Sequence, residues 1–301
     1  MAISRYWLGI AFFFLQMLVS CGNDIVSKFM GQRLDAIEVT FFRFFFGLIT
    51  LLPFMIGRGT NIFKTKQLTM NVVRGLLGAI SFFLYIDAVI TLPLSEVVII
   101  LWTIPLFSLV LSSIFLKESV TAYRWIATLI GFIGLTLITT YNSQHSMSFN
   151  ILYLIPIGAA FLFALQDIVI KKMVAAEENQ LTMLFYFALV TSAALFVPAC
   201  KVWQTPTAFE LTMLFILGAG GNLIQYFIFK AFSLIDVSAV APYRYLELFV
   251  SAILAYLFFR EIPGANVYIG ALILIPSTLC LGYTESRKKK KAAKLAKQQS
   301  A

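Results

Sequence analysis

Charged side chains are scarce in this sequence. Asp, Glu, Lys and Arg make up 12% of its 301 residues, whereas about 25% is usual for a soluble domain. Hydrophobic residues account for 60%, and the mean hydropathy is +0.89. This composition excludes a soluble domain and predicts a protein that crosses a lipid bilayer several times.

Residues that bind metals or form disulfides are also few. The single histidine, His145, lies in a polar connection, and the three cysteines, Cys21, Cys200 and Cys280, are far apart in or beside apolar segments. Their spacing fits neither a metal site nor a disulfide framework. The sequence also lacks a phosphate-binding loop and a histidine–acid or cysteine–histidine pair. We therefore predict no metal, no cofactor and no enzymatic activity.

Positive charge is concentrated near the C-terminal end. The net charge is +9, and Arg287–Lys297 holds seven basic residues and no acidic ones, so the rest of the chain carries 9 − 7 = +2. No basic face of a folded domain is left that would bind nucleic acid. The tail is typical of a cytoplasmic segment that lies beside anionic lipids.

Ten apolar segments approach the length of about 20 helical residues that a bilayer crossing requires. Short joints with Gly and Pro separate them, and Lys and Arg in these joints favour the side of the basic tail, so we expect both termini to be cytoplasmic. The segments are Tyr6–Ser27, Ala36–Ile56, Leu68–Ile90, Leu94–Leu116, Tyr123–Thr140, Phe149–Ile170, Leu181–Ala199, Phe209–Ala231, Val237–Phe258 and Val267–Tyr283.

The two halves of the chain repeat after a shift of 143 positions. The shift superposes Asp24 on Asp167, Lys28 on Lys171, Gly75 on Gly218, Gly78 on Gly221 and Glu118 on Glu261. Each half has an odd number of segments, so the second half is inserted upside down. We therefore predict an all-α membrane protein with ten transmembrane helices in two inverted five-helix repeats, residues 1–143 and 144–285, and a basic tail at 286–301. Inverted repeats are typical of secondary transporters, whose solute site lies where the halves meet.

Two charged pairs, Lys117-Glu118 and Arg260-Glu261, close the fourth and ninth segments. With the five-plus-five arrangement, they resemble the drug/metabolite transporter superfamily and its duplicated EamA domain over about Tyr6 to Tyr283. More narrowly, the chain resembles the S-adenosylmethionine uptake transporters of obligate intracellular bacteria. The strings that carry this resemblance are SCGNDIVSKFMG, FFRFFFGLITLLPF, VVRGLLG, IPLF and APYRYLELFVSAI. The resemblance implies a central cavity in the bacterial inner membrane and inward movement of S-adenosylmethionine, alone or in exchange for S-adenosylhomocysteine.

The ninth segment contains both a guanidinium and a carboxylate. Arg244 and Glu247 lie near its middle, where a charge costs about 3 kcal/mol, and they are one turn apart on one helix face. Pro242 lacks an N–H and weakens the helix beside them. We interpret this stretch as a substrate-binding site; the alternative is an internal Arg–Glu pair that only ties two helices.

Aromatic side chains accompany these charges. A guanidinium suits a carboxylate, a carboxylate suits an ammonium or sulfonium, and an aromatic ring suits a purine or a cation. Trp102 occupies the repeat position of Tyr245, so we expect both to face the cavity. The predicted substrate-binding set is Arg244, Glu247, Tyr243, Tyr245, Trp102 and Arg43. Arg43, in the second segment, either contacts the ligand or pairs with a buried acid.

The remaining charges in the segments are given other roles. Asp24 with Lys28, and Asp167 with Lys171, are four residues apart, which predicts ion pairs or a gate. Arg74 is expected to anchor its helix by reaching the membrane interface. Two functions stay open: import of S-adenosylmethionine, or export of another small metabolite such as an amino acid or a drug.

Overall fold

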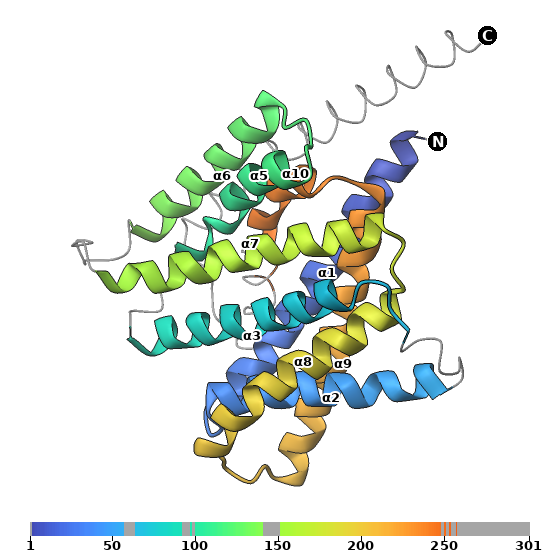
Figure 1. Ribbon diagram of the computed structural model, residues 1–301. Helices are drawn as coiled ribbons and strands as arrows, with labels where there is room; N and C mark the ends of the chain where they lie inside the picture. The colour runs from blue at the N-terminus through green and yellow to red at the C-terminus, as the bar shows by residue number, and fades with distance from the viewer. Residues whose placement is uncertain are drawn as a thin grey trace.

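The computed structural model describes residues 2–56, 64–91, 97, 100–140, 151–247, 250, 253 and 257. Within these residues the secondary structure is helical, joined by turns and short connections. In this described part of the chain, six helices are long and apolar enough to cross a membrane (Figure 1). They are α1 (Ala2–Met30), α2 (Ala36–Ile56), α3 (Leu68–Thr91), α7 (Leu154–Ala175), α8 (Gln180–Lys201) and α9 (Ala208–Leu234).

Five shorter elements complete the described part of the chain. They are α5 (Ile104–Phe115), α6 (Ala122–Thr140), η2 (Ile151–Tyr153), α10 (Val237–Val240) and η3 (Ala241–Leu246). The prediction of one continuous helix from Leu94 to Leu116 is wrong, because Trp102 and Thr103 form a turn and α5 starts only at Ile104. Pro105 in the first turn of α5 fits a helix start, where its missing N–H needs no partner. The predicted tenth segment and the basic tail lie outside the described residues.

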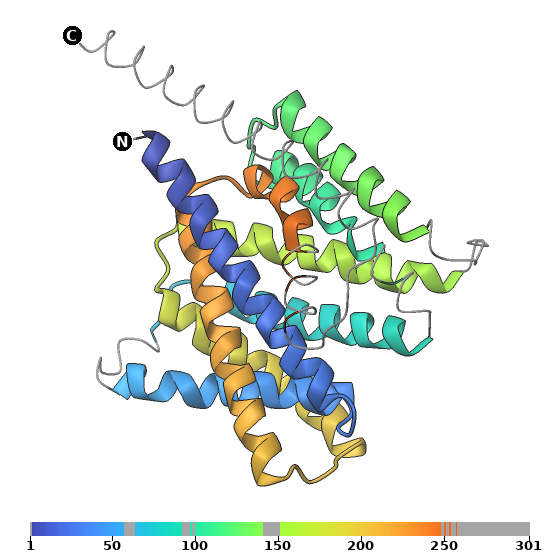
Figure 2. The ribbon, with the colours of Figure 1, turned by 180° about the vertical axis from the view of Figure 1, so that it is seen from behind.

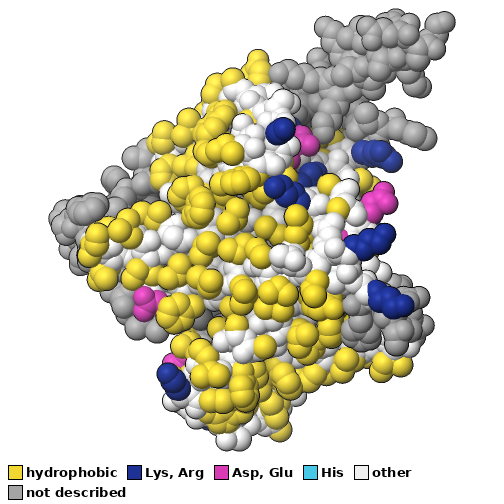
Figure 3. Space-filling model, in the orientation of Figure 1, with side chains coloured by type: hydrophobic (Ala, Val, Ile, Leu, Met, Phe, Trp, Pro, Cys, Tyr) yellow, Lys and Arg dark blue, Asp and Glu magenta, His cyan; other side chains and the backbone are white. Residues whose placement is uncertain are grey.

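The surface of the molecule is largely apolar. Hydrophobic side chains cover most of the face in Figure 3, whereas Lys, Arg, Asp and Glu gather toward its edges. Large side chains such as Phe54, Ile114 and Phe209 are more than half exposed. A soluble monomer rarely leaves so extensive an apolar surface in water, so this surface is suited to lipid.

The helices pack in pairs that the 143-residue shift exchanges. Helix α1 packs along α9, as Figure 2 shows, and its repeat equivalent α7 packs against α3. In the same way α2 packs against α9 and α3 against α8, while α2 also packs against its own equivalent, α8. Such an exchange is what a two-fold axis between the two repeats would produce.

Side chains follow the same two-fold relation where α2, α3, α8 and α9 pack together. The rings of Phe44 and Phe187, which are repeat equivalents, meet edge to face with centroids 5.3 Å apart. A Cβ at Gly218 would lie 2.6 Å from the backbone N of Gly47, and one at Gly75 would lie 2.5 Å from Val190 Cβ. Gly75 and Gly218 thus allow close helix packing.

A bidentate ion pair connects two joints between long helices. Thr207 and Glu210 form a capping box at the start of α9, which satisfies two backbone N–H groups of the first turn. Glu210 also accepts hydrogen bonds from Arg33, in the α1–α2 joint, whose Nε lies 2.6 Å from Oε1. The hydrogen bond to this carboxylate raises the pKa of Arg33, and it ties the α1–α2 joint to the α8–α9 joint.

Candidate functional site

The predicted ninth segment is broken near Pro242. Four residues of α-helix, α10, lead directly into the 3-10 helix η3, which contains Pro242 and Arg244. The prediction that Pro242 weakens the helix here is in agreement with this change of helix type. A 3-10 segment is narrower than an α-helix and is often found where a sequence is strained or functional.

Arg244 forms an ion pair with Asp167 of α7. Asp167 is buried, with 7% of its side chain exposed, whereas Arg244 retains 22%. The Arg244 guanidinium also lies 5.7 Å from the ring centroid of Phe13 in α1. The structure therefore joins the predicted binding residue Arg244 to Asp167, which we expected to pair with Lys171, and brings three helical elements together at this point.

The side chain of Lys171, from α7, reaches the C-terminal end of α9. Its Nζ donates to the carbonyl oxygens of Phe232 (2.5 Å) and Ile235 (2.7 Å). A lysine ammonium stabilises the C-terminal carbonyls of a helix, which otherwise have no partner. Its repeat equivalent, Lys28, has a side chain outside the described part of the structure.

Glu247 packs against α1. Its backbone carbonyl lies 3.9 Å from Cys21 Sγ, and its carboxylate interacts with Ser20 and with the charges of Asp24 and Arg244. Asp24 in turn interacts with Arg43 of α2. Glu247 and Asp24 thus each interact with one of the two arginines that we predicted to bind substrate.

The predicted aromatic residues meet at the repeat interface. Tyr245 donates a hydrogen bond to the backbone oxygen of its repeat equivalent, Trp102, at 3.2 Å. The Tyr243 hydroxyl lies 3.5 Å from that of Tyr6. Both Tyr243 and Tyr245 are buried, with at most 3% exposed, so in this conformation their rings serve as packing between the halves.

Arg74 is a buried part of the site that sequence reasoning missed. Its exposure is 0%, so the prediction of an interfacial anchor is wrong. Nη1 donates to the Met183 carbonyl at 3.0 Å and Nη2 to Gln225 Oε1 at 2.8 Å, and the guanidinium stacks 4.1 Å from the Phe187 ring centroid. The sequence did hold one indication of this burial, because Arg74 lies about two helical turns inside the third apolar segment.

Together these residues form a set of buried charges that we name the charge series. Neighbouring members interact electrostatically, and the set holds three cations and three anions, so its formal charge is zero. The members are Arg43, Asp24, Glu247, Arg244, Asp167 and Arg74. Charges inside membrane helices are costly and are usually retained for a function. The series can therefore attract groups of either sign to the middle of the helices.

A small hollow adjoins Arg43. It lies between α2, α3, α8 and α9 and has a cavity volume of about 30 Å³. Arg43, Asn222, Gln225, Phe82 and Phe187 contribute to its wall. Sequence reasoning missed the two amides, although each stands alone among apolar neighbours in the eighth segment.

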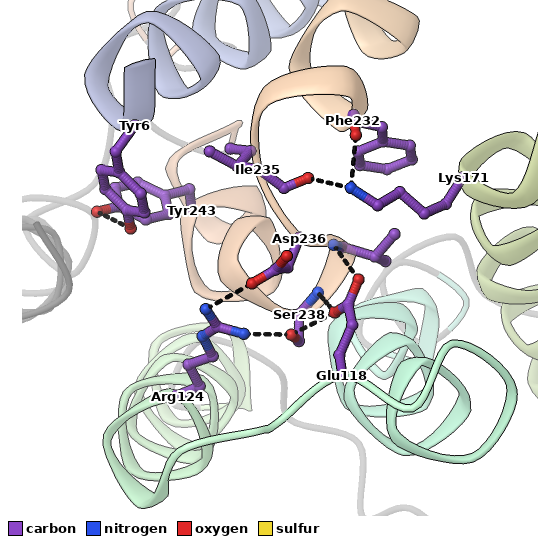
Figure 4. Close-up of polar contacts among 10 residues, drawn as sticks. Tyr6, Glu118, Arg124, Lys171, Phe232, Ile235, Asp236, Ser238 and Tyr243 are labelled. Atoms are coloured by element: carbon purple, nitrogen blue, oxygen red, sulfur yellow. Dashed lines mark hydrogen bonds and ion pairs between the residues drawn. The ribbon is translucent and has the colours of Figure 1, made fainter. Parts of the chain in front are cut away.

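A second polar group lies at the joint between α9 and α10 (Figure 4). Glu118, just after α5, accepts hydrogen bonds from the backbone N–H groups of Val237 and Ser238, each at 3.1 Å, and from the Ser238 hydroxyl at 2.6 Å. Arg124 of α6 donates to the same hydroxyl at 2.5 Å and to Asp236 at 3.1 Å. We name these four side chains the end cluster.

Replacing Glu118 with glutamine is expected to loosen the end cluster. The amide has one acceptor oxygen in place of a carboxylate, so charge-assisted bonds worth about 1.5–3 kcal/mol are weakened or lost. We expect a lower unfolding temperature for the purified protein in detergent. The matched control is Lys117→Gln, because Lys117 is exposed; equal losses in both variants would contradict a role for the carboxylate.

Both halves of the chain are similar to one family of known proteins. The model of the EamA-like transporter family matches residues 7–140 and again residues 150–283. The chain belongs to the EamA-like transporter family. The family model thus matches the chain twice, once in each half. As a member of this family, the protein is a multi-pass membrane transporter of a small molecule and not an enzyme.

Several relatives of this chain have names that state the compound they transport. The S-adenosylmethionine uptake transporter of Rickettsia bellii is 42% identical over 95% of this chain and 97% of its own length. That of Rickettsia prowazekii is 43% identical over 95% and 96%. A riboflavin transporter of Vibrio cholerae is 28% identical over 87% and 88%. A crystal structure with a TM-score of 0.77 and 15% identity covers 95% of this chain and 98% of its own, which shows a shared fold.

Proposed function

We propose that this protein imports S-adenosylmethionine by alternating access. The observation that carries the proposal is the similarity to the Rickettsia uptake transporters, at 42% and 43% identity over 95% of the chain. The charge series supports it, because the ligand combines a carboxylate with an ammonium and a sulfonium. A guanidinium of the series suits the carboxylate, and its negative charges attract a positively charged ligand into the membrane.

We further propose that ten helices cross the bacterial inner membrane as two inverted repeats, with both termini in the cytoplasm. The exchange of helix contacts by the 143-residue shift supports a two-fold relation between the repeats. The boundaries remain those of the sequence analysis, residues 1–143 and 144–285, with the tail at 286–301. Cysteine-scanning with a membrane-impermeant thiol reagent tests the orientation: a cysteine at Lys66 should be labelled from the cytoplasmic side, and one at Gln204 from the outside.

Uptake is tested with the purified protein in liposomes. We expect saturable uptake of labelled S-adenosylmethionine that excess unlabelled compound suppresses, whereas riboflavin and free amino acids leave it unchanged. Empty liposomes provide the background. Background-level uptake of S-adenosylmethionine, together with transport of another compound of the panel, would favour the alternative, a carrier of another metabolite.

Exchange is tested in the same liposomes. Because an exchanger returns to the starting conformation faster when loaded, liposomes preloaded with S-adenosylhomocysteine should take up labelled S-adenosylmethionine faster than liposomes preloaded with buffer. Equal initial rates would contradict exchange and would leave import as a uniport or ion-coupled process.

A further inference from the structure

The hollow beside Arg43 has a fixed pattern of hydrogen-bond donors and acceptors. Gln225 Oε1 accepts from Arg74 Nη2 at 2.8 Å. An arginine has only donors, so the oxygen of this amide must face Arg74. The amide NH₂ of Gln225 is therefore the group left for the hollow, and Arg74 acts as a positioning residue that holds it there.

The second amide has the opposite orientation. Asn222 Nδ2 donates to the backbone oxygen of Gly47 at 2.7 Å and to Thr50 Oγ1 at 2.9 Å. A carbonyl oxygen is only an acceptor, so the NH₂ of this amide must face α2. The oxygen of Asn222 is left as an acceptor in the wall of the hollow.

Arg43 supplies the charge of the hollow. Its guanidinium lies 5.7 Å from the ring centroid of Phe82, and the described residues offer it no hydrogen bond or ion pair. Its donors are available to a ligand, and Asp24 is the acid that interacts with it electrostatically. Gly221 also belongs to the wall of the hollow, and a Cβ there would be in ordinary van der Waals contact with Arg43 Nε, at 3.5 Å.

The polar residues of the hollow have no polar counterpart of the same kind at the repeat-related positions. After the 143-residue shift the equivalents of Arg43, Asn222 and Gln225 are Tyr186, Ala79 and Phe82. The polar hollow therefore breaks the symmetry of the fold, which helix packing alone does not require.

We propose that this hollow binds the α-amino-carboxylate end of the transported molecule. The carboxylate accepts hydrogen bonds from Arg43 and from the Gln225 amide, and the ammonium donates to Asn222 Oδ1. The sulfur and its neighbouring carbons lie along the apolar part of the wall, which Phe82 and Phe187 provide. This assignment rests on the proposed function and specifies which end of the ligand meets which residues.

The assignment is tested by competition against uptake of labelled S-adenosylmethionine. The two competitors are unlabelled S-adenosylmethionine and its decarboxylated form, which lacks only the carboxylate. The wild type should prefer the complete molecule by roughly tenfold or more, since a charge-assisted hydrogen bond is lost. In Arg43→Gln this preference should fall strongly, because the charged donor is lost, and competition by the decarboxylated form should change less.

A pair of glycine variants repeats the test without removing a charge. Gly221→Ala places a methyl group 3.5 Å from Arg43 Nε, and Gly158→Ala places one at the same distance from Leu84 Cδ1, away from the hollow. Gly221→Ala should weaken the complete molecule selectively, whereas Gly158→Ala should behave as the wild type. This pair decides the matter should Arg43→Gln fail to fold.

Three results would overturn the assignment. In the first the wild type shows no preference between the competitors, and in the second Arg43→Gln keeps the wild-type preference. In the third Gly221→Ala weakens both competitors equally. If the wild type takes up no S-adenosylmethionine, the proposed function fails and this assignment fails with it, a result distinct from the other three.

Discussion

Replacing Arg244 with glutamine is expected to abolish most uptake and to destabilise the protein. Asp167 would keep its charge in a site where 7% of its side chain is exposed, and a buried charge without its partner costs about 3–5 kcal/mol. Arg244 belongs to the predicted substrate-binding set, so uptake should also fall roughly 10- to 150-fold, as expected when a hydrogen bond of about 1.5–3 kcal/mol is lost. Unfolding temperature and initial uptake rate measure the two effects separately.

The double variant Arg244→Gln with Asp167→Asn separates binding from structure. It removes both charges, so the stability lost in the single variant should return. A role of Arg244 in binding requires that uptake stays low in the folded double variant. Wild-type uptake there would show that the pair only ties η3 to α7. Arg33→Gln, at the Arg33–Glu210 pair in the joints, is the matched control and should leave uptake unchanged.

Replacing Gly218 with alanine is expected to prevent close packing of α9 on α2. The added Cβ would lie 2.6 Å from Gly47 N and 2.8 Å from the carbonyl carbon of Phe46. Both are backbone atoms, so a side-chain rotation cannot relieve the overlap, and the helices must separate. Overpacking of this kind costs about 1–3 kcal/mol or more, and the adjoining hollow would change shape. We expect a lower yield of folded protein and loss of uptake.

Gly22→Ala is the matched control for this variant. Gly22 is also inside a long helix, and a Cβ there would meet nothing within 4 Å. Alanine favours a helix over glycine by about 1 kcal/mol, so Gly22→Ala should be as stable as the wild type or more stable. Equal yields and unfolding temperatures for the two variants would contradict the importance of the Gly218–Gly47 contact.

Much of the candidate site could be predicted from the sequence, because charged residues are rare in segments that cross a bilayer. Arg43, Arg244 and Glu247 stand in apolar segments, where a charge has to be explained. Pro242 indicated a weakened helix, and the structure has η3 there. The prediction of one continuous helix across Trp102 was wrong, since apolar composition does not distinguish a straight helix from a turn between two helical pieces.

The partners of these charges were not predictable in the same way. Spacing within one helix favoured Asp167 with Lys171, but Asp167 pairs with Arg244, 77 positions away, and Lys171 stabilises the end of α9. Arg74 was expected at the interface, but it is enclosed by α8 and α9. A sequence pattern reports neighbours on one helix, whereas these partners depend on which helices lie side by side.

By itself the sequence determined that this protein is a helical membrane protein with two related halves, because hydropathy and the 143-residue repeat are properties of the chain alone. It also located the charges that a bilayer would exclude. Only the tertiary structure decided which charges meet, since the α1–α9 and α3–α7 contacts bring distant segments together. It also decided the orientation of the amides of Asn222 and Gln225, because each is fixed by a partner on another helix.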